Sequence, residues 1–346
     1  MAKIIALFNN KGGVSKTTTT FHLGWILAEM GHKTLIVDTD PQCNLTGLCI
    51  GLGKKDKLNN LYRNKEYDNI KDILSPVFDG RPEPLKAANC YCFERNNNLF
   101  LLPGHIEFSE YDASYNIAEN LTGSLKLLQN IPGALSEVLK LTIKQYDIKY
   151  VLLDMSPSIS STNANILMQS DYFFVPCAPD YFCYMAIESL IKVFPRWNDA
   201  YSKIRENEIF KNATYKIKSS PPQFIGTIQQ RYRPRNSSPS KAFSEWISDI
   251  NNLVKDKLIP VLNNINMAVQ FNSHNYEEQY NLINIADFNS LIAYSQICNT
   301  PVFLLTQDQV GKTGKVWENM QQNRDDFQQI FKTLASRLIN VTQSNG

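Results

Sequence analysis

Short apolar runs recur along the chain, and they predict the strands of a buried parallel sheet. They occupy residues 4–8, 34–37, 99–102, 150–153 and 224–228. Parallel strands are covered on both faces and are therefore apolar along their whole length, whereas a half-exposed strand alternates apolar and polar positions. Apolar residues at helical spacing follow in 23–30, 187–197 and 327–338. The pattern predicts an α/β fold with helices that pack on a sheet.

A loop with two adjacent glycines joins the first strand to the first helix. Gly12 and Gly13 let the backbone approach a ligand closely, and the N–H groups of the loop and of the helix start can surround an anion. In such a loop Lys16 contacts the β- and γ-phosphates, and the Thr17 hydroxyl binds Mg²⁺. The alternative is a glycine turn with two solvated lysines. We expect a nucleotide site made by Lys11, Gly12, Gly13, Val14, Ser15, Lys16, Thr17 and Thr18.

Acidic residues end two of the predicted strands. Asp38 and Asp40 follow the run 34–37, and Asp154 follows the run 150–153. Ligands of parallel α/β sheets bind at the carboxyl ends of the strands, where carboxylates beside a triphosphate can hold Mg²⁺ and orient water. We predict Mg²⁺ contacts from Thr17, Asp38 and Asp154. Taken without the glycine loop, the aspartates after residue 37 would equally suit a turn or a helix cap.

Composition adds few constraints. The 346 residues carry a net charge of +2, so any affinity for nucleic acid has to come from a local patch. Seven scattered cysteines, an odd number, favour a reducing compartment over a disulfide framework. The first strand begins close to the N-terminus and no window approaches 18 apolar residues, so we expect a cytoplasmic protein without a signal peptide.

Four collinear motifs resemble those of the ParA/MinD class of P-loop ATPases. The loop at 11–17 resembles the deviant Walker A pattern KGGxxK[ST], and 38–44 resembles the segment DxDPQxN. The stretch 154–158 is similar to the switch pattern DxPPS with Ser156 in place of the first proline, and 175–181 is similar to VPxxPE. The resemblance implies that Lys11 reaches the nucleotide of a partner subunit, that Lys16 acts within its own subunit, and that Asp40 supports hydrolysis.

The resemblance further implies a fold and an activity. The fold would be one doubly wound domain over 1–346, with a mostly parallel sheet flanked by helices and insertions near 52–98, 199–220 and 262–283. The activity would be slow ATP hydrolysis with Mg²⁺ by an ATP-dependent homodimer that a ParB-like protein stimulates. The chain end after Asn340 lacks the basic residues of a membrane-binding helix, so no membrane partner is expected.

Two functional interpretations stay open. The first is partition of a plasmid or chromosome, or positioning of another cargo, through ATP-dependent nonspecific binding to DNA of the nucleoid. The second is a nucleotide switch or scaffold in regulation or defence that binds no DNA. It is favoured by Phe288 and Leu291, which stand where many partition ATPases have DNA-binding arginines.

The segment after the strand at 224–228 bears on both interpretations. By the same resemblance, Gln230 and Arg231 are expected to contact the adenine base. Arg231, Arg233 and Arg235 could form a patch for the DNA backbone, and a solvated loop is the alternative.

Overall fold

One eight-stranded sheet organises the protein. The computed structural model describes residues 2–51, 54–120, 128–232, 234–235, 238–239, 241–270 and 280–344. The strand order is β10-β7-β6-β1-β5-β2-β4-β3, and every neighbouring pair is parallel except β3 with β4. The strands are β1 (Lys3–Leu7), β2 (Thr34–Asp38), β3 (Tyr91–Phe93), β4 (Asn96–Leu102), β5 (Tyr150–Asp154), β6 (Tyr172–Cys177), β7 (Gln223–Tyr232) and β10 (Asn281–Ala286). A separate pair joins β8 (Pro234–Arg235) to β9 (Ser238–Pro239).

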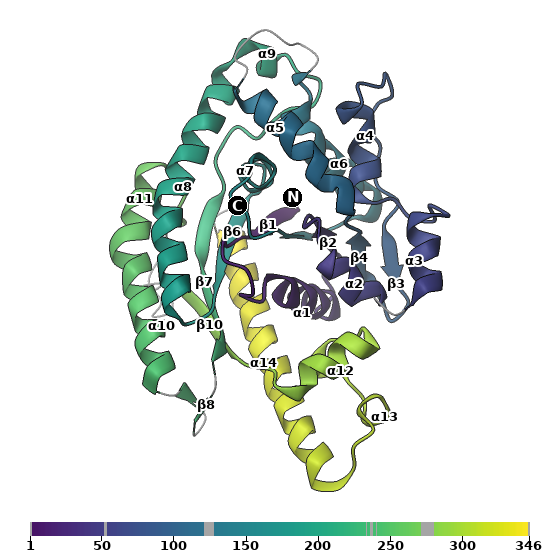
Figure 1. The fold of residues 1–346 in the computed structure, drawn as a ribbon, viewed down its shortest axis with the longest axis vertical. Coiled ribbons are helices and arrows are strands. Elements are labelled where there is room, and N and C mark those ends of the chain that lie inside the picture. The colour runs from purple at the N-terminus through teal and green to yellow at the C-terminus, as the bar shows by residue number, and fades with distance from the viewer. Residues whose placement is uncertain are drawn as a thin grey trace.

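Helices cover both faces of the sheet and bury two apolar cores (Figure 1). The first face carries α4 (Ile70–Phe78), α5 (Tyr111–Asn120), α6 (Ile131–Tyr146), α7 (Ser161–Met168), α8 (Tyr181–Glu206), α9 (Glu208–Lys211), α10 (Lys241–Leu253), the π-helical turn η3 (Val254–Leu258) and α11 (Ile259–Asn264). The second carries α1 (Lys16–Glu29), α2 (Asn44–Ile50), α3 (Lys55–Tyr62), α12 (Ser290–Cys298), η4 (Val302–Leu304), α13 (Gln307–Val310) and α14 (Gly314–Ser344). The α/β fold predicted from the apolar runs and the doubly wound architecture implied by the resemblance are both confirmed.

The central strands are apolar because both of their faces are covered. All five residues of β2 and of β5 are buried, which explains why these runs lack the alternation of a half-exposed strand. The apolar stripe predicted over 327–338 packs from α14 against the second core. Among the described helices, none combines the length and the apolar character that a bilayer crossing requires.

The insertion expected near 199–220 is rich in lysine, asparagine and glutamate, a composition that predicts a solvated segment, and this is wrong for its first half. Helix α8 continues through this region to Glu206, and Tyr201 and Ile204 are buried on its inner face. Phe210 on α9 is buried as well. These apolar residues fall between lysines, asparagines and glutamates, so composition averaged over the window hides the buried face that helical spacing would reveal.

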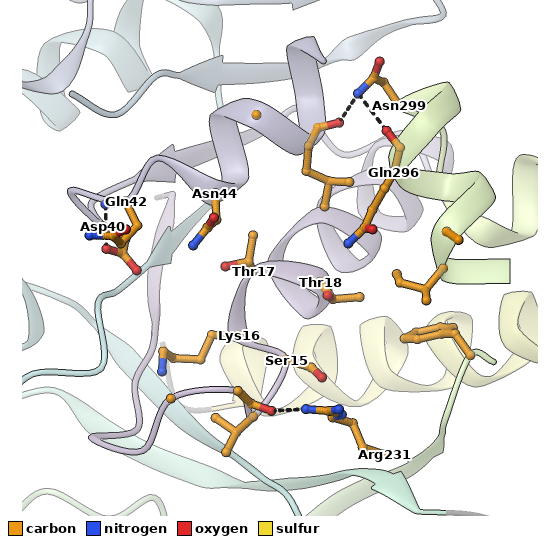
Figure 2. Close-up of a pocket in the computed structure, with 18 of the residues that line it drawn as sticks. Ser15, Lys16, Thr17, Thr18, Asp40, Gln42, Asn44, Arg231, Gln296 and Asn299 are labelled. Carbon is orange, nitrogen blue, oxygen red and sulfur yellow. Dashed lines mark hydrogen bonds between the residues drawn. The ribbon is translucent and has the colours of Figure 1, made fainter. Parts of the chain in front are cut away.

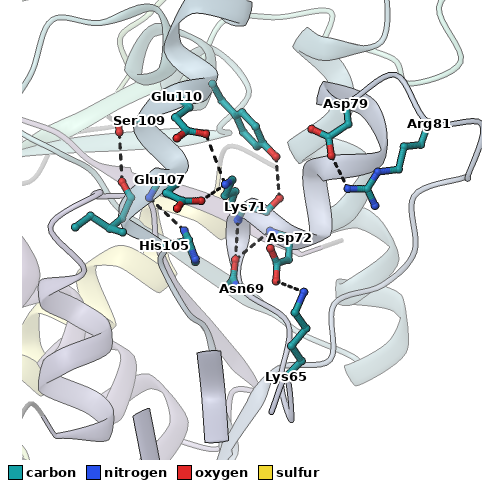
Figure 3. A network of polar contacts seen from close by, with 12 residues as sticks. Lys65, Asn69, Lys71, Asp72, Asp79, Arg81, His105, Glu107, Ser109 and Glu110 are labelled. Carbon is teal, nitrogen blue, oxygen red and sulfur yellow. Dashed lines mark hydrogen bonds and ion pairs between the residues drawn. The ribbon is translucent and has the colours of Figure 1, made fainter. Parts of the chain in front are cut away.

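Polar contacts tie α4 to the 3₁₀ helix η1 (Ile106–Glu110), as Figure 3 shows. The Asn69 side chain caps α4 by accepting bonds from the N–H groups of Lys71, at 3.1 Å, and Asp72, at 3.0 Å. The Lys71 ammonium pairs with Glu107 and, at 3.6 Å, with Glu110. Since both glutamates are exposed, solvent screens these pairs and the helix cap contributes more to holding α4 in place.

Candidate nucleotide-binding site

The loop between β1 and α1 forms an open cradle at the carboxyl edge of the sheet. Gly13, with φ of 72°, and Ser15, with φ of 60°, take left-handed conformations that wrap the backbone around the loop centre. The Lys16 ammonium donates to the carbonyl oxygens of Asn9, at 3.0 Å, and Lys11, at 3.1 Å. These bonds fix Lys16 beside the curve of the loop, where a phosphate chain would lie.

A cavity of about 970 Å³ extends from this loop (Figure 2). Its volume is within the usual range for sites that hold a nucleotide-sized ligand. One end is lined by residues of the loop and by Asp40, Gln42 and Asn44; the other is lined by Asp287, Phe288, Ile292 and Gln296. The loop end offers N–H groups and an ammonium for phosphates, and the opposite end offers an aromatic ring and side-chain amides for a base.

Asp154 is the carboxylate with no hydrogen-bonding partner at this site. It ends β5, its exposed fraction is 0%, and neither of its oxygens accepts a hydrogen bond in the described structure. Burial raises the pKa of Asp154 well above its usual value, the neighbouring Asp38 raises it further, and Thr17 and Lys16 partly offset both. A buried carboxylate without a donor is costly unless a cation joins it.

A magnesium ion fits this arrangement. Asp154 and the Thr17 hydroxyl are neighbours that supply oxygen atoms, the ligand type that Mg²⁺ prefers, and Thr17 lines the cavity in which phosphate oxygens would complete the coordination. No group of three or more histidine, cysteine, aspartate or glutamate side chains forms a metal site anywhere among the described residues, this site included. Mg²⁺ typically takes one or two protein ligands together with phosphates and water, so this set is sufficient.

Asp40 and Asp38 have different surroundings in the structure. Asp40 lines the cavity, and one of its oxygens accepts a bond from the Gln42 N–H at 2.9 Å. Asp38 lies beneath the loop that follows β2, where Oδ2 accepts bonds from the Thr46 N–H at 2.8 Å and the Thr46 hydroxyl at 2.7 Å. Neither Asp38 nor Asp154 lines the cavity. Asp38 differs in that its carboxylate already accepts these hydrogen bonds, so its contacts give the expected Mg²⁺ contact from Asp38 no support. Its carboxylate instead anchors the first turn of α2.

The turn after β4 supports the same region from the side. The Gly104 N–H donates to the Thr46 hydroxyl at 2.9 Å. A Cβ atom at Gly104 would lie 2.9 Å from Cγ of Asp38 and 3.2 Å from Sγ of Cys43. Only glycine fits between the turn and this carboxylate without displacing it, so β4 and α2 are held at a fixed separation.

Lys11 is paired within its own subunit. Its ammonium lies 2.6 Å from Oδ1 and 2.5 Å from Oδ2 of Asp180, with 23% of the lysine and 45% of the aspartate side chain exposed. Asp180 also caps α8, because Oδ1 accepts the Cys183 N–H at 2.8 Å. Asp180 therefore links the glycine loop to the start of α8, a contact the sequence did not predict.

The residues expected to contact the base or DNA differ in where the structure places them. Gln230 is buried behind the loop, where its amide donates to the Thr19 hydroxyl at 2.7 Å, so it does not reach the cavity as expected. Arg231 does line the cavity, and its guanidinium donates to the Gly13 carbonyl at 2.7 Å. Arg233 and the side chain of Arg235 lie outside the described residues, so the expected DNA patch stays a prediction.

Sequence reasoning missed the wall contributed by α12. Ile292 and Gln296 are four residues apart and therefore share one face of this helix, which borders the cavity. The Asn299 amide, at the end of the helix, donates to the Leu48 carbonyl at 2.9 Å and so joins α12 to α2 across the cavity (Figure 2). The paired spacing of Ile292 and Gln296 was visible in the sequence, but nothing there indicated what they face.

The comparisons with known proteins agree with this geometry. A family model described as an AAA domain matches residues 2–206. An uncharacterised protein of Methanocaldococcus jannaschii is 28% identical over 242 residues, covering 70% of this chain and 78% of that protein. The sporulation initiation inhibitor protein Soj of Bacillus subtilis is 29% identical over 191 residues, covering 55% of this chain and 64% of Soj.

Solved structures share the fold at lower identity. A protein from Corynebacterium diphtheriae superposes with a TM-score of 0.63 at 21% identity, over 86% of this chain and 97% of that one. The septum site-determining protein MinD from Pyrococcus horikoshii, crystallised with Mg-ADP, gives 0.52 at 17% identity, over 98% and 96% of the two chains. At these identities the likeness concerns the fold, and the residue roles rest on the geometry described above.

Proposed function

Because this chain belongs to the AAA-domain family of P-loop ATPases, together with proteins of the ParA and MinD type, we propose that it binds ATP with Mg²⁺ and hydrolyses it slowly. The observation that carries the proposal is the buried carboxylate of Asp154, whose oxygens have no hydrogen-bonding partner and which neighbours Lys16 and Thr17 of the loop. Such a group is retained at a cost to stability when a bound cation completes it.

The residues of the loop divide the work. Backbone N–H groups from Gly12 to Thr18 and the Lys16 ammonium bind the phosphates, while Thr17 and Asp154 hold Mg²⁺, which neutralises charge on the phosphate oxygens. Burial lowers the pKa of Lys16 to about 8, and a triphosphate bound beside it would raise this pKa and hold the ammonium in its charged form. Asp40, at the cavity wall, orients the attacking water.

Lys11 couples the nucleotide to dimerisation in this proposal. In the free subunit its ammonium is held by Asp180. When two ATP-bound subunits meet, Lys11 leaves this pair and contacts the phosphates bound by the partner, because a triphosphate carries more negative charge than one carboxylate. Hydrolysis removes that attraction and releases the dimer. A ParB-like activator would set the rate.

We further propose that the dimer acts in partition of DNA or positioning of another cargo by binding DNA without sequence preference. Support comes from relatives named as chromosome-partitioning proteins, among them ParA of Caulobacter vibrioides, 24% identical over 262 residues. The test is retention of the purified protein on nonspecific double-stranded DNA with ATP, with ADP and without nucleotide, across a salt series. Binding that requires ATP and weakens with salt supports DNA partition. An ATP-bound dimer that passes unretained at low salt refutes it.

A second candidate is a nucleotide switch that binds no DNA. The observation that favours it is the burial of Phe288 and Leu291, which have exposed fractions of 7% and 3%. Both side chains belong to the second core, so this surface lacks the arginines that partition ATPases use there. An ATP-bound dimer that is not retained on DNA would support this second function. Pull-down with the ATP-bound protein would then identify its partner.

A further inference from the structure

A second hollow lies between α8 and α10, away from the nucleotide cavity. It has a volume of about 480 Å³, and none of its lining residues lines the nucleotide cavity. The two helices run side by side at one edge of the molecule (Figure 1). Three aromatic side chains and two carboxylates line it: Tyr181, Tyr184, Trp246, Asp249 and Asp256. We propose that this groove binds an arginine or lysine side chain from an extended segment of a partner protein.

The aromatic rings are arranged to receive a cation. The ring centroid of Trp246 lies 5.9 Å from that of Tyr181 and 6.4 Å from that of Tyr184, with interplanar angles of 63° and 61°. The rings meet edge to face rather than stacked flat, so they cover only part of one another's π faces and form a corner in the lining of the groove. A guanidinium or ammonium group against such faces gains about 0.5–2 kcal/mol from the ring quadrupole.

The first turn of α8 adds apolar surface next to this corner. Tyr181, Phe182 and Met185 are 55%, 69% and 46% exposed, which is unusual for three large side chains within five residues. Tyr184 and Trp246 are half-buried and so are held in place by their surroundings. A docking peptide can therefore bury the exposed side chains while its cation enters the corner.

Charge selects the cation. Asp249 and Asp256 form no ion pair within the described part of the chain, whereas many surface carboxylates of this protein are paired. Lys257 also lines the groove, which leaves an excess of one negative charge. Two unpaired carboxylates attract a guanidinium or ammonium and repel the phosphates of nucleic acid, so the charges favour a protein segment over DNA.

The backbone at the groove supports a binding role independently. Asp256 and Lys257 belong to η3, a π-helical turn inserted between α10 and α11. Such turns are rare, have weaker hydrogen-bond geometry than an α-helix and occur frequently at functional sites. Here the turn carries Asp256 and Lys257 on the groove side, while its residues Val254 and Leu258 are buried.

The site is independent of the proposed ATPase activity, but its position allows the two to communicate. Tyr181 directly follows Asp180, which holds Lys11 of the glycine loop. A segment seated against Tyr181 therefore lies one residue away from the ion pair at the nucleotide site.

The test uses the full-length protein labelled with fluorotryptophan and observed by ¹⁹F NMR. The chain has four tryptophans, and Trp246→Phe identifies the signal of the groove. The probes are acetyl-Gly-Arg-Gly-amide and the same peptide with citrulline, which keeps the shape of arginine without its charge. We expect the arginine peptide to shift the Trp246 signal saturably, with an affinity about tenfold above that of the citrulline peptide.

The matched variant is Asp249→Asn with Asp256→Asn. Both residues are exposed, so the protein should fold normally, which a thermal melt checks, and the arginine preference should fall to near parity. Equal shifts from both peptides in the wild-type protein would overturn the proposal, and so would an unchanged preference in the double variant. The test is run without nucleotide and measures no ATP hydrolysis, so failure here leaves the ATPase proposal standing.

Discussion

Replacing Asp154 with asparagine should stabilise the nucleotide-free protein and remove its response to Mg²⁺. The wild-type carboxylate is fully buried and accepts no hydrogen bond in the described structure, a situation that costs about 1–3 kcal/mol for a polar group and more for a charged one. Asparagine is close in shape and its amide has no partner there either, so the substitution removes only the cost of the charge. We therefore expect the free energy of unfolding to rise by about 1–3 kcal/mol, which for a chain of 346 residues is about 1.5–4 °C in melting temperature.

The control is the same substitution at Asp38, which lies directly across from Asp154 in the register of β2 and β5. Asp38 accepts bonds from the N–H and the hydroxyl of Thr46, so Asp38→Asn should destabilise the protein by about 1–3 kcal/mol. The two substitutions should therefore change the free energy of unfolding in opposite directions, and urea denaturation without nucleotide measures both changes.

Adding ligand completes the test. Saturation with ATP and Mg²⁺ at about 100 times the dissociation constant should stabilise the wild-type protein by about 2.7 kcal/mol. In Asp154→Asn, Mg²⁺ should add little to the effect of ATP with a chelator. The reasoning is refuted if Asp154→Asn is less stable than the wild type without nucleotide, or if Mg²⁺ stabilises both proteins equally.

Three further outcomes are expected. Asp180→Asn keeps an oxygen that caps α8 but loses the ion pair with Lys11, so it should change the free energy of unfolding by under about 1 kcal/mol. Because Lys11 is then free to reach a partner subunit, the dimer should form at a lower ATP concentration in light scattering. An unchanged ATP concentration would show that Asp180 does not hold Lys11 back. Burial lowers the pKa of His22 to about 4 from 6.5, so the contribution of neutral His22 to the free energy of unfolding is complete above pH 6.5 and falls by up to about 3 kcal/mol as the pH drops to about 4. In chemical denaturation, His22→Gln should therefore lose less stability than the wild type over this pH range. An equal loss in the two proteins would refute this. Gly104→Ala should lower the free energy of unfolding, measured by urea denaturation, by about 1–3 kcal/mol because its Cβ would press on Asp38; an unchanged free energy would mean that the turn moves to make room.

The strands and the glycine loop were predictable because their residue types answer local requirements. A strand buried on both faces has to be apolar, as β2 and β5 are, and a loop that wraps an anion needs the freedom of Gly12 and Gly13. The acidic residues after these strands followed from the rule that ligands bind at the carboxyl edge. These signals lie within a few residues of one another, so no long-range contact was needed to find them.

The roles of individual polar side chains were not predictable, because they depend on partners far away in the sequence. Gln230 turns to Thr19 rather than to the cavity, and the pair formed by Lys11 and Asp180 joins residues separated by 169 positions. Asp38 and Asp154 end adjacent strands and look equivalent in sequence, yet only Asp38 receives donors, from the turn of α2. Which of the two carboxylates receives hydrogen-bond donors depends on how the rest of the chain packs around the strand ends.

The central claim is that ATP joins two copies of this chain through Lys11. The direct measurement is the molar mass in solution, by light scattering after gel filtration, for the wild type, Lys11→Ala and Lys16→Ala, each with ATP and Mg²⁺, with ADP and Mg²⁺, and without nucleotide. Of the three conditions, the account predicts twice the monomer mass for the wild type only with ATP and Mg²⁺. It predicts monomers for both variants in every condition, with Lys11→Ala still binding ATP. A wild-type protein that stays monomeric when saturated with ATP, or a Lys11→Ala protein that dimerises and hydrolyses normally, would contradict it.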